Sequence, residues 1–200
     1  MPVQVLELSL VQTFLTATEC LALAANPQLA SLRSLDLSCN PITSLGLVNL
    51  VHPRRSTFQS LQKLTLFSAE IDFQQAYLLS QQDLEECKVR FTLKELNLSN
   101  NPLGYLLNYV TEIGLINPQL ELLLLFNCQI DDEQLLKLAD SKRVEALVRV
   151  DLGNNLLDQN VMMSVKLLRE NCAQLQDLML NGNKNVKNCG NFQIQKPKRS

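Results

Sequence analysis

Near the middle of the chain, residues 93–103 read Leu93-Lys94-Glu95-Leu96-Asn97-Leu98-Ser99-Asn100-Asn101-Pro102-Leu103. Leucines occupy the first, fourth, sixth and eleventh positions of this stretch, and asparagine occupies the ninth. The alternation in its first half predicts a short strand with one buried face, because successive side chains of a strand point to opposite sides. One such copy would be weak evidence, so the fold depends on whether the pattern recurs at a fixed period.

The pattern recurs along the whole chain. Seven copies are in register, with first positions at Val3, Leu32, Leu61, Leu93, Leu120, Leu147 and Leu175. The steps between them are 29, 29, 32, 27, 27 and 28 residues, a regularity that chance does not produce. The first and last copies fit less well at the eleventh position, where Thr13 and Asn185 stand. Atypical terminal copies are expected of a repeat array.

The remainder of each period of about 28 residues returns the chain to the start of the next strand. In the sixth period, its apolar residues have the spacing of one helical face, at Leu157, Val161, Val165 and Leu168. In the fifth, Asp131, Asp132 and Glu133 place negative charge where a helix would begin. The repeating unit is therefore strand, turn, helix and loop.

Unequal widths predict that this stack curves. Neighbouring strands lie about 4.8 Å apart, whereas packed helices need about 8 to 10 Å. We therefore expect an α/β solenoid shaped as a horseshoe, with a parallel sheet on its concave face and helices on its convex face. One domain of about seven repeats would span residues 1–186, followed by a polar basic tail at 187–200. The longest step, before Leu93, predicts a convex-side loop near residues 81–88.

The eleven-residue string is the signature of leucine-rich repeats. The period and the full helix resemble the ribonuclease-inhibitor-like subfamily, over residues 3–186. This resemblance implies a right-handed α/β horseshoe, in which the asparagine side chain bonds free backbone groups between adjacent turns. Ala69 replaces that asparagine in the third copy, where we expect a gap. The resemblance says little about function, because members include inhibitors, GTPase-activating proteins, innate-immune sensor domains, actin-filament caps and bacterial effectors.

Composition excludes several classes of protein. With 18 basic and 20 acidic residues the net charge is −2, which argues against a nucleic-acid-binding surface. No apolar run is long enough to cross a membrane. Glu7 lies inside the apolar stretch at the N-terminus, whereas the apolar region of a signal peptide carries no charge. The six cysteines form no C-x-x-C pair, which favours reduced structural thiols. We therefore expect a cytoplasmic protein, with secretion as an effector into a host cell left open.

Few residues suggest catalysis, so we expect no catalytic residue, no cofactor and no metal. The sole histidine, His52, stands beside Pro53 and is expected in an exposed loop. No phosphate-binding glycine loop occurs, and the adjacent acids Asp131 and Asp132 are typical of a helix start. A cysteine nucleophile stays open, although no cysteine has an identifiable base.

The informative residues lie between the leucines. Positions three, five and seven should face the concave surface, and most of them are polar. The fifth copy is the exception, with Leu122, Leu124 and Phe126 at these positions. Because apolar clusters rimmed by polar groups mark interaction sites, we predict that these three bind a protein. Neighbouring strands would supply the rim, at Lys94, Asn97, Arg149, Asp151 and Met179.

Three functions therefore compete. The leading hypothesis is a non-catalytic module that binds a protein partner through its concave face. The second is a regulatory subunit, such as a GTPase activator, that contributes a polar residue to a partner's active site. The third is a bacterial effector that engages a host protein. Self-association also stays open, because a second copy or the C-terminal tail could cover the apolar face of residues 121–126 instead.

Overall fold

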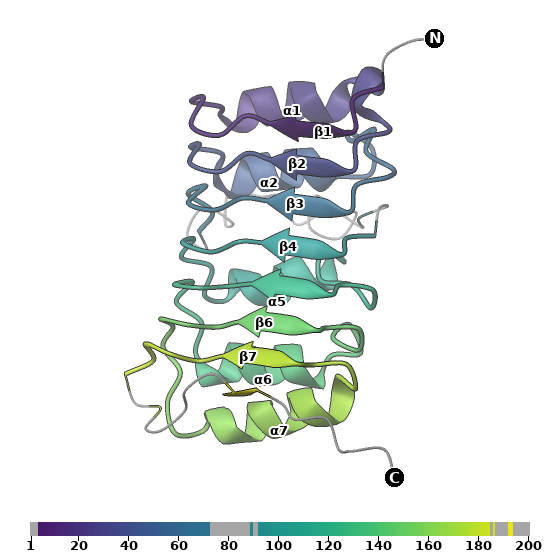
Figure 1. The fold of residues 1–200 in the computed structure, drawn as a ribbon. Coiled ribbons are helices and arrows are strands. Elements are labelled where there is room, and N and C mark those ends of the chain that lie inside the picture. Colours follow the sequence, from purple (N-terminus) through teal and green to yellow (C-terminus); the bar gives the residue numbers. More distant parts are fainter. Residues whose placement is uncertain (1–3, 73–88, 90–91, 185, 187–191, 194–200) are drawn as a thin grey trace.

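A computed structural model of the chain describes residues 4–72, 89, 92–184, 186 and 192–193. Its strands form one sheet in the order of the sequence, with the helices stacked behind it (Figure 1). Seven strands run parallel: β1 (Glu7–Ser9), β2 (Ser34–Asp36), β3 (Lys63–Thr65), β4 (Glu95–Asn97), β5 (Leu122–Leu124), β6 (Arg149–Asp151) and β7 (Asp177–Met179). The predicted α/β leucine-rich-repeat solenoid is confirmed.

The return segments contain the expected helices. They are α1 (Ala17–Ala25), α2 (Thr43–Val51), α5 (Leu106–Glu112), α6 (Asp132–Asp140) and α7 (Val161–Asn171), with a short 3-10 helix η1 (Pro27–Leu29). The acids predicted to start a helix do so: Asp131 is the N-cap of α6, and its Oδ1 accepts the N–H groups of Glu133 and Gln134. The loop expected near residues 81–88 lies outside the described residues.

The last parallel strand does not end the sheet. Strand β8 (Phe192–Gln193) pairs with β7 in the antiparallel direction, so that Phe192 lies opposite Leu178. The expected polar tail, residues 187–200, thus contributes two residues to the sheet. The rest of that tail lies outside the described residues.

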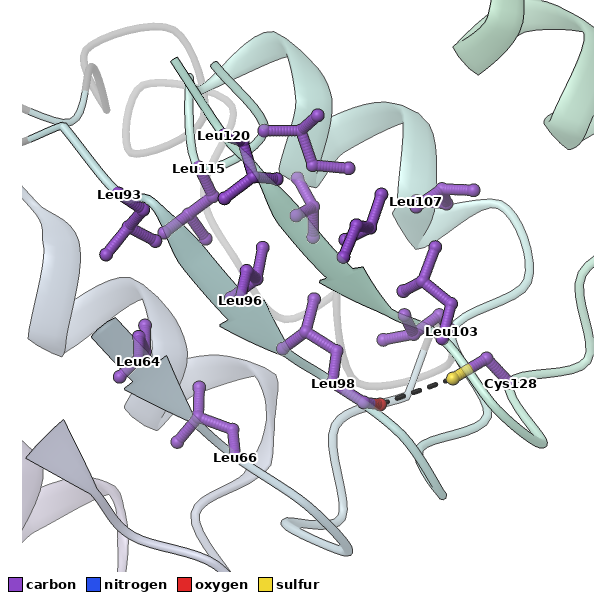
Figure 2. Close-up of a cluster of buried hydrophobic side chains, with 14 of the residues drawn as sticks. Leu64, Leu66, Leu93, Leu96, Leu98, Leu103, Leu107, Leu115, Leu120 and Cys128 are labelled. Atoms are coloured by element: carbon purple, nitrogen blue, oxygen red, sulfur yellow. Dashed lines mark hydrogen bonds between the residues drawn. The ribbon is translucent and has the colours of Figure 1, made fainter. Parts of the chain in front are cut away.

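Leucines at the first, fourth and sixth positions fill the space between sheet and helices. In the fourth repeat, Leu93, Leu96 and Leu98 are buried, as are Leu64 and Leu66 of the repeat before. Figure 2 shows these side chains with others of the interior, among them Leu103 and Leu107. Each leucine is covered by a repeat on either side, which explains why no repeat can bury its apolar face alone.

The first repeat begins two residues later than the sequence pattern suggested. Leu8 pairs with Leu35, which places the first position at Val5 rather than Val3. The true fourth and sixth positions are therefore Leu8 and Leu10. The register that starts at Val3 is equally apolar, and a shift by two residues leaves every side chain on the same face of the strand. Periodicity therefore could not distinguish the two registers.

A buried asparagine amide joins each of several turns to the turn before. The Oδ1 atom of Asn101 accepts the N–H groups of Ala69 (2.9 Å) and Ile71 (3.1 Å). Its Nδ2 donates to the carbonyl oxygens of Leu66 (2.7 Å) and Leu98 (2.8 Å). The same bonds recur at two other asparagines, and most of them at a third: Asn40, Asn155 and Asn183. This bonding between turns is what the resemblance implied.

Proline replaces part of that bonding where the next turn lacks asparagine. The methyl side chain of Ala69 cannot accept a hydrogen bond from the N–H of Ile42. That N–H instead donates to the carbonyl of Asn40 (2.8 Å) across Pro41. The N–H of Ile42, which the expected gap at Ala69 would have left unpaired, is therefore bonded within its own turn. The turn around Pro102 repeats the arrangement before Cys128, whose Sγ bonds the carbonyl of Leu98 at 3.2 Å (Figure 2). Proline suits such a three-residue turn because its φ is already near the required value.

Every described turn has a left-handed residue at its eighth position, and proline affects where a second one falls. In the first, third and fifth copies, whose turns lack proline, the second lies at the tenth position, as at Gln129 (φ 57°). Proline cannot adopt that angle, and in the two proline turns the second positive φ falls at the twelfth position, on Thr43 (66°) and Gly104 (46°). Their N–H groups bond the next turn in the same way, to the carbonyls of Ala69 and Cys128. A β-branched threonine is strained there, whereas glycine is not.

We therefore expect Thr43→Gly to stabilise the protein by about 1 kcal/mol, since relief of a left-handed non-glycine residue exceeds the entropy cost of glycine. Urea denaturation measures the change. The reciprocal variant Gly104→Thr should destabilise by about 1 to 2 kcal/mol. Loss of stability in Thr43→Gly, as for glycine in an ordinary helix, would contradict this account.

Leu96→Ala should lower the free energy of unfolding by about 2 to 5 kcal/mol, because it opens a cavity in the core. Asn101→Ala should lower it by about 1 to 3 kcal/mol, because it leaves buried backbone groups of two turns unpaired. Equilibrium denaturation of both variants tests this, with Lys94→Ala as an exposed control in the same repeat. Unchanged midpoints would mean that the repeats are held together differently.

Candidate protein-binding surface

The outward face of the sheet, called here the strand face, carries the third, fifth and seventh positions of each repeat. In β5 the alternation is clear, because Leu123 and Leu125 are fully buried. Leu122 and Leu124 between them are half-buried, and Phe126, two residues after the strand, is 37% exposed. The structure thus brings the three apolar residues predicted from sequence onto one face of one strand.

Phe126 is held in place by small neighbours along the seventh-position row. Its N–H donates to the Oγ of Ser99 (3.2 Å) on one side. On the other side stands Gly153, where a Cβ atom would lie 2.9 Å from Cδ2 of Phe126. Phe67 is likewise flanked by serines, Ser38 and Ser99, in this row. Sequence reasoning missed Phe67 and Gly153, although the alternation of large and small residues at the seventh position was a signal for both.

Three of the five predicted rim residues flank the apolar strand, and a fourth lies on the strand after that. Strand register places Asn97 and Asp151 on either side of Leu124, and Arg149 beside Leu122. Met179 lies one strand further, next to Asp151, and its Sδ is 3.8 Å from Nη2 of Arg149.

Lys94 differs from the other four. It precedes β4, in the row of second positions, and its Nζ lies 3.4 Å from Oε1 of Glu121. Both side chains are about half exposed, so this ion pair lies at the edge of the strand face and contributes little to stability.

Acids outnumber bases at the third and fifth positions. The acids are Glu7, Asp36, Glu95, Asp151 and Asp177, and the bases are Lys63 and Arg149. Nζ of Lys63 is 2.8 Å from Oε2 of Glu95, and this hydrogen bond raises the pKa of Lys63. Asp151 Oδ1 accepts the N–H of Gly153 (2.9 Å), which orders the carboxylate beside the apolar strand. The strand face is therefore an apolar row with an acidic surround.

Three buried thiols are not activated as nucleophiles. Burial raises the pKa of the thiols of Cys20, Cys128 and Cys172 to about 12. Such thiols stay protonated at neutral pH, and the thiolate is the reactive form. Cys39 is exposed, while Cys87 and Cys189 lie outside the described residues.

His52 is not the exposed loop residue that the sequence suggested. It is 3% exposed and forms the C-cap of α2, and its Nδ1 accepts the N–H of Arg54 (3.2 Å). The N–H groups of Arg55 and Ser56 donate to its backbone carbonyl, so the loop turns back at the end of α2. The expectation of exposure was wrong because α2 is an interior helix whose end is covered by that loop.

Two carboxyls meet at the start of α6, on the helix side of the molecule. Asp132 Oδ1 accepts the N–H of Asp158 (3.1 Å). Burial and the hydrogen bond to the Asp158 carboxyl raise the pKa of Asp132 to about 6. Among the described residues, no three His, Cys, Asp or Glu side chains are grouped as a metal site would require.

Comparison with known families agrees with the repeats and the sheet. A sequence model of the family described as Leucine Rich repeat matches residues 28–51 and 91–105, which contain the second and fourth copies of the signature. The repeats of the chain are leucine-rich repeats. Repeats of this family generally mediate protein–protein interaction, and the family is typically non-catalytic. No curated protein matches the chain. In the described part of this leucine-rich-repeat protein, no helix has the length and apolar character needed to cross a bilayer.

Gly153→Ala in this leucine-rich-repeat protein should displace the Phe126 ring, since the added methyl group would lie 2.9 Å from it and 3.1 Å from Oδ1 of Asp151. We expect a loss of about 1 to 3 kcal/mol in stability. A double-mutant cycle with Phe126→Ala measures the part that the ring causes. The loss should shrink when the ring is absent, and an equal loss in both backgrounds would exclude the ring as the cause.

Proposed function

We propose that this leucine-rich-repeat protein is a non-catalytic interaction module that binds a protein partner through its strand face. Leu122, Leu124 and Phe126 are the anchor of the site, and Asn97, Arg149, Asp151 and Met179 form its rim. The observation that carries the proposal is the apolar row of β5, which stands in a face whose other rows are largely polar. Partly exposed apolar clusters of this kind are typical of interaction sites.

The anchor is preorganised for binding. Leu122 and Leu124 belong to a central strand that is hydrogen-bonded to β4 and β6 on its two sides. The alternating Leu123 and Leu125 fix that strand to the core. A partner that binds here therefore orders few groups, and a small number of well-packed aromatic and aliphatic anchors can carry most of the binding energy.

The surround defines the chemistry of the partner. Carboxylates of Asp151 and Asp177 lie on the two strands that follow the apolar row, and Asp36 lies further along the face. Complementary charge accelerates association and excludes wrong partners. We therefore expect a partner surface with apolar side chains bordered by basic groups, and binding that weakens as salt concentration rises.

The test is a Leu124→Asp, Phe126→Asp double variant, compared with the wild type in affinity capture from a native lysate followed by mass spectrometry. The variant should remain folded by circular dichroism and lose the captured partner, because two charges would be buried in the interface. The matched control is Leu156→Asp, Met163→Asp, which changes two side chains that are each 63% exposed and lie outside the strands. Capture that survives in the strand-face variant would show that the partner binds elsewhere.

A further inference from the structure

Strand β1 is the first strand of the sheet in the described residues. Among the described residues it pairs only with β2, whereas the opposite end, β7, is covered by the antiparallel strand β8 (Figure 1). The carbonyl of Leu6 and the N–H groups of Leu10 and Gln12 are directed at β2 and bonded there. Because backbone groups alternate in direction along a strand, Glu7, Ser9 and Val11 direct theirs away from the sheet. An open edge of this kind is a template for another strand.

The edge has a sequence that is complementary to itself. Residues 5–11 read Val5-Leu6-Glu7-Leu8-Ser9-Leu10-Val11, which is nearly the same in both directions. A two-fold axis at Leu8 makes two copies antiparallel, and it sets valine opposite valine and leucine opposite leucine. Glu7 then lies opposite Ser9 of the second copy, so no like charges meet. A two-fold interface requires this self-complementarity.

The first repeat also exposes more apolar surface than its counterparts. Leu6 is 41% exposed and Val11 43%, and Leu21 on α1 is 40% exposed. The core face of β1 is covered less completely at Leu8 and Leu10, which are partly exposed, whereas the equivalent Leu35 and Leu37 are 1% and 0% exposed. Glu19 is the single charged residue of α1, and apolar helices of this kind are normally covered.

We propose that two copies of this chain join head to head through β1, in antiparallel register about Leu8, and extend the sheet across the dimer. The dimer is independent of the partner proposed for the strand face.

The register gives a charge test at Ser9. Ser9→Lys places a lysine opposite Glu7 twice per dimer and should tighten the dimer about two- to tenfold, and Ser9→Glu should weaken it by a similar factor. The exchange Glu7→Ser, Ser9→Glu restores the original pairing and should return the dissociation constant to the wild-type value. Sedimentation equilibrium of the full chain from about 1 μM to about 1 mM measures all four proteins.

Thr65→Lys and Thr65→Glu are the matched controls, because Thr65 ends β3 as Ser9 ends β1, away from the edge. These variants should leave the dissociation constant unchanged. A monomer throughout the concentration range would overturn the proposal. A dimer whose dissociation constant does not change with the charge at position 9 would also overturn it, as would one whose dissociation constant changes equally with charge at position 65.

Crosslinking gives an independent readout of register. Leu8→Cys would lie opposite itself across the two-fold axis, at a cross-strand Cβ separation of about 4.5 to 5.5 Å, and mild oxidation should join two chains. Ser9→Cys would lie opposite Glu7 and should not crosslink above the background that the wild-type cysteines give. Equal crosslinking of both variants, or of neither, would overturn the proposed register.

Discussion

The asparagine amide buried between adjacent turns is what allows such short strands to stack. Each of the seven parallel strands is three residues long and makes few backbone hydrogen bonds with its neighbour. Asn101 adds bonds to the preceding turn and to its own, in an interior where each unpaired group would cost about 1 to 3 kcal/mol. Leucine burial then drives the turns together, while the amide fixes how far one is displaced from the next.

The array tolerates a missing asparagine because a turn can satisfy itself. Pro41 closes its own turn where Ala69 follows, and Pro102 does the same where Cys128 follows. The consequence is a positive φ at the twelfth position, which Gly104 accommodates and Thr43 adopts with strain. Local backbone chemistry and the residue one turn away are therefore linked, although they are nearly 30 residues apart in sequence.

The rigid interior leaves the strand face free to vary. Side chains at the fifth position, such as Asn97, Leu124 and Asp151, lie side by side on neighbouring strands while the buried leucines beneath them repeat. A repeat array can thus change what it recognises without changing what holds it together. The two ends of the sheet differ in the same molecule, since β7 has an antiparallel neighbour and β1 has none among the described residues.

The sequence alone determined the period, the buried leucines, the helix start at Asp131 and the apolar row of Leu122, Leu124 and Phe126. All of these follow from local spacing, which sets the face on which a side chain lies. Only the tertiary structure decided the first register at Val5, the burial of His52, and the contact between Phe126 and Gly153. These depend on neighbours one repeat or one loop away. A two-residue slip and a covering loop leave no periodic trace, because periodicity records only the face on which a residue lies. The alternation of large and small residues at the seventh position indicates a small neighbour for Phe126, but not how closely its ring approaches Gly153.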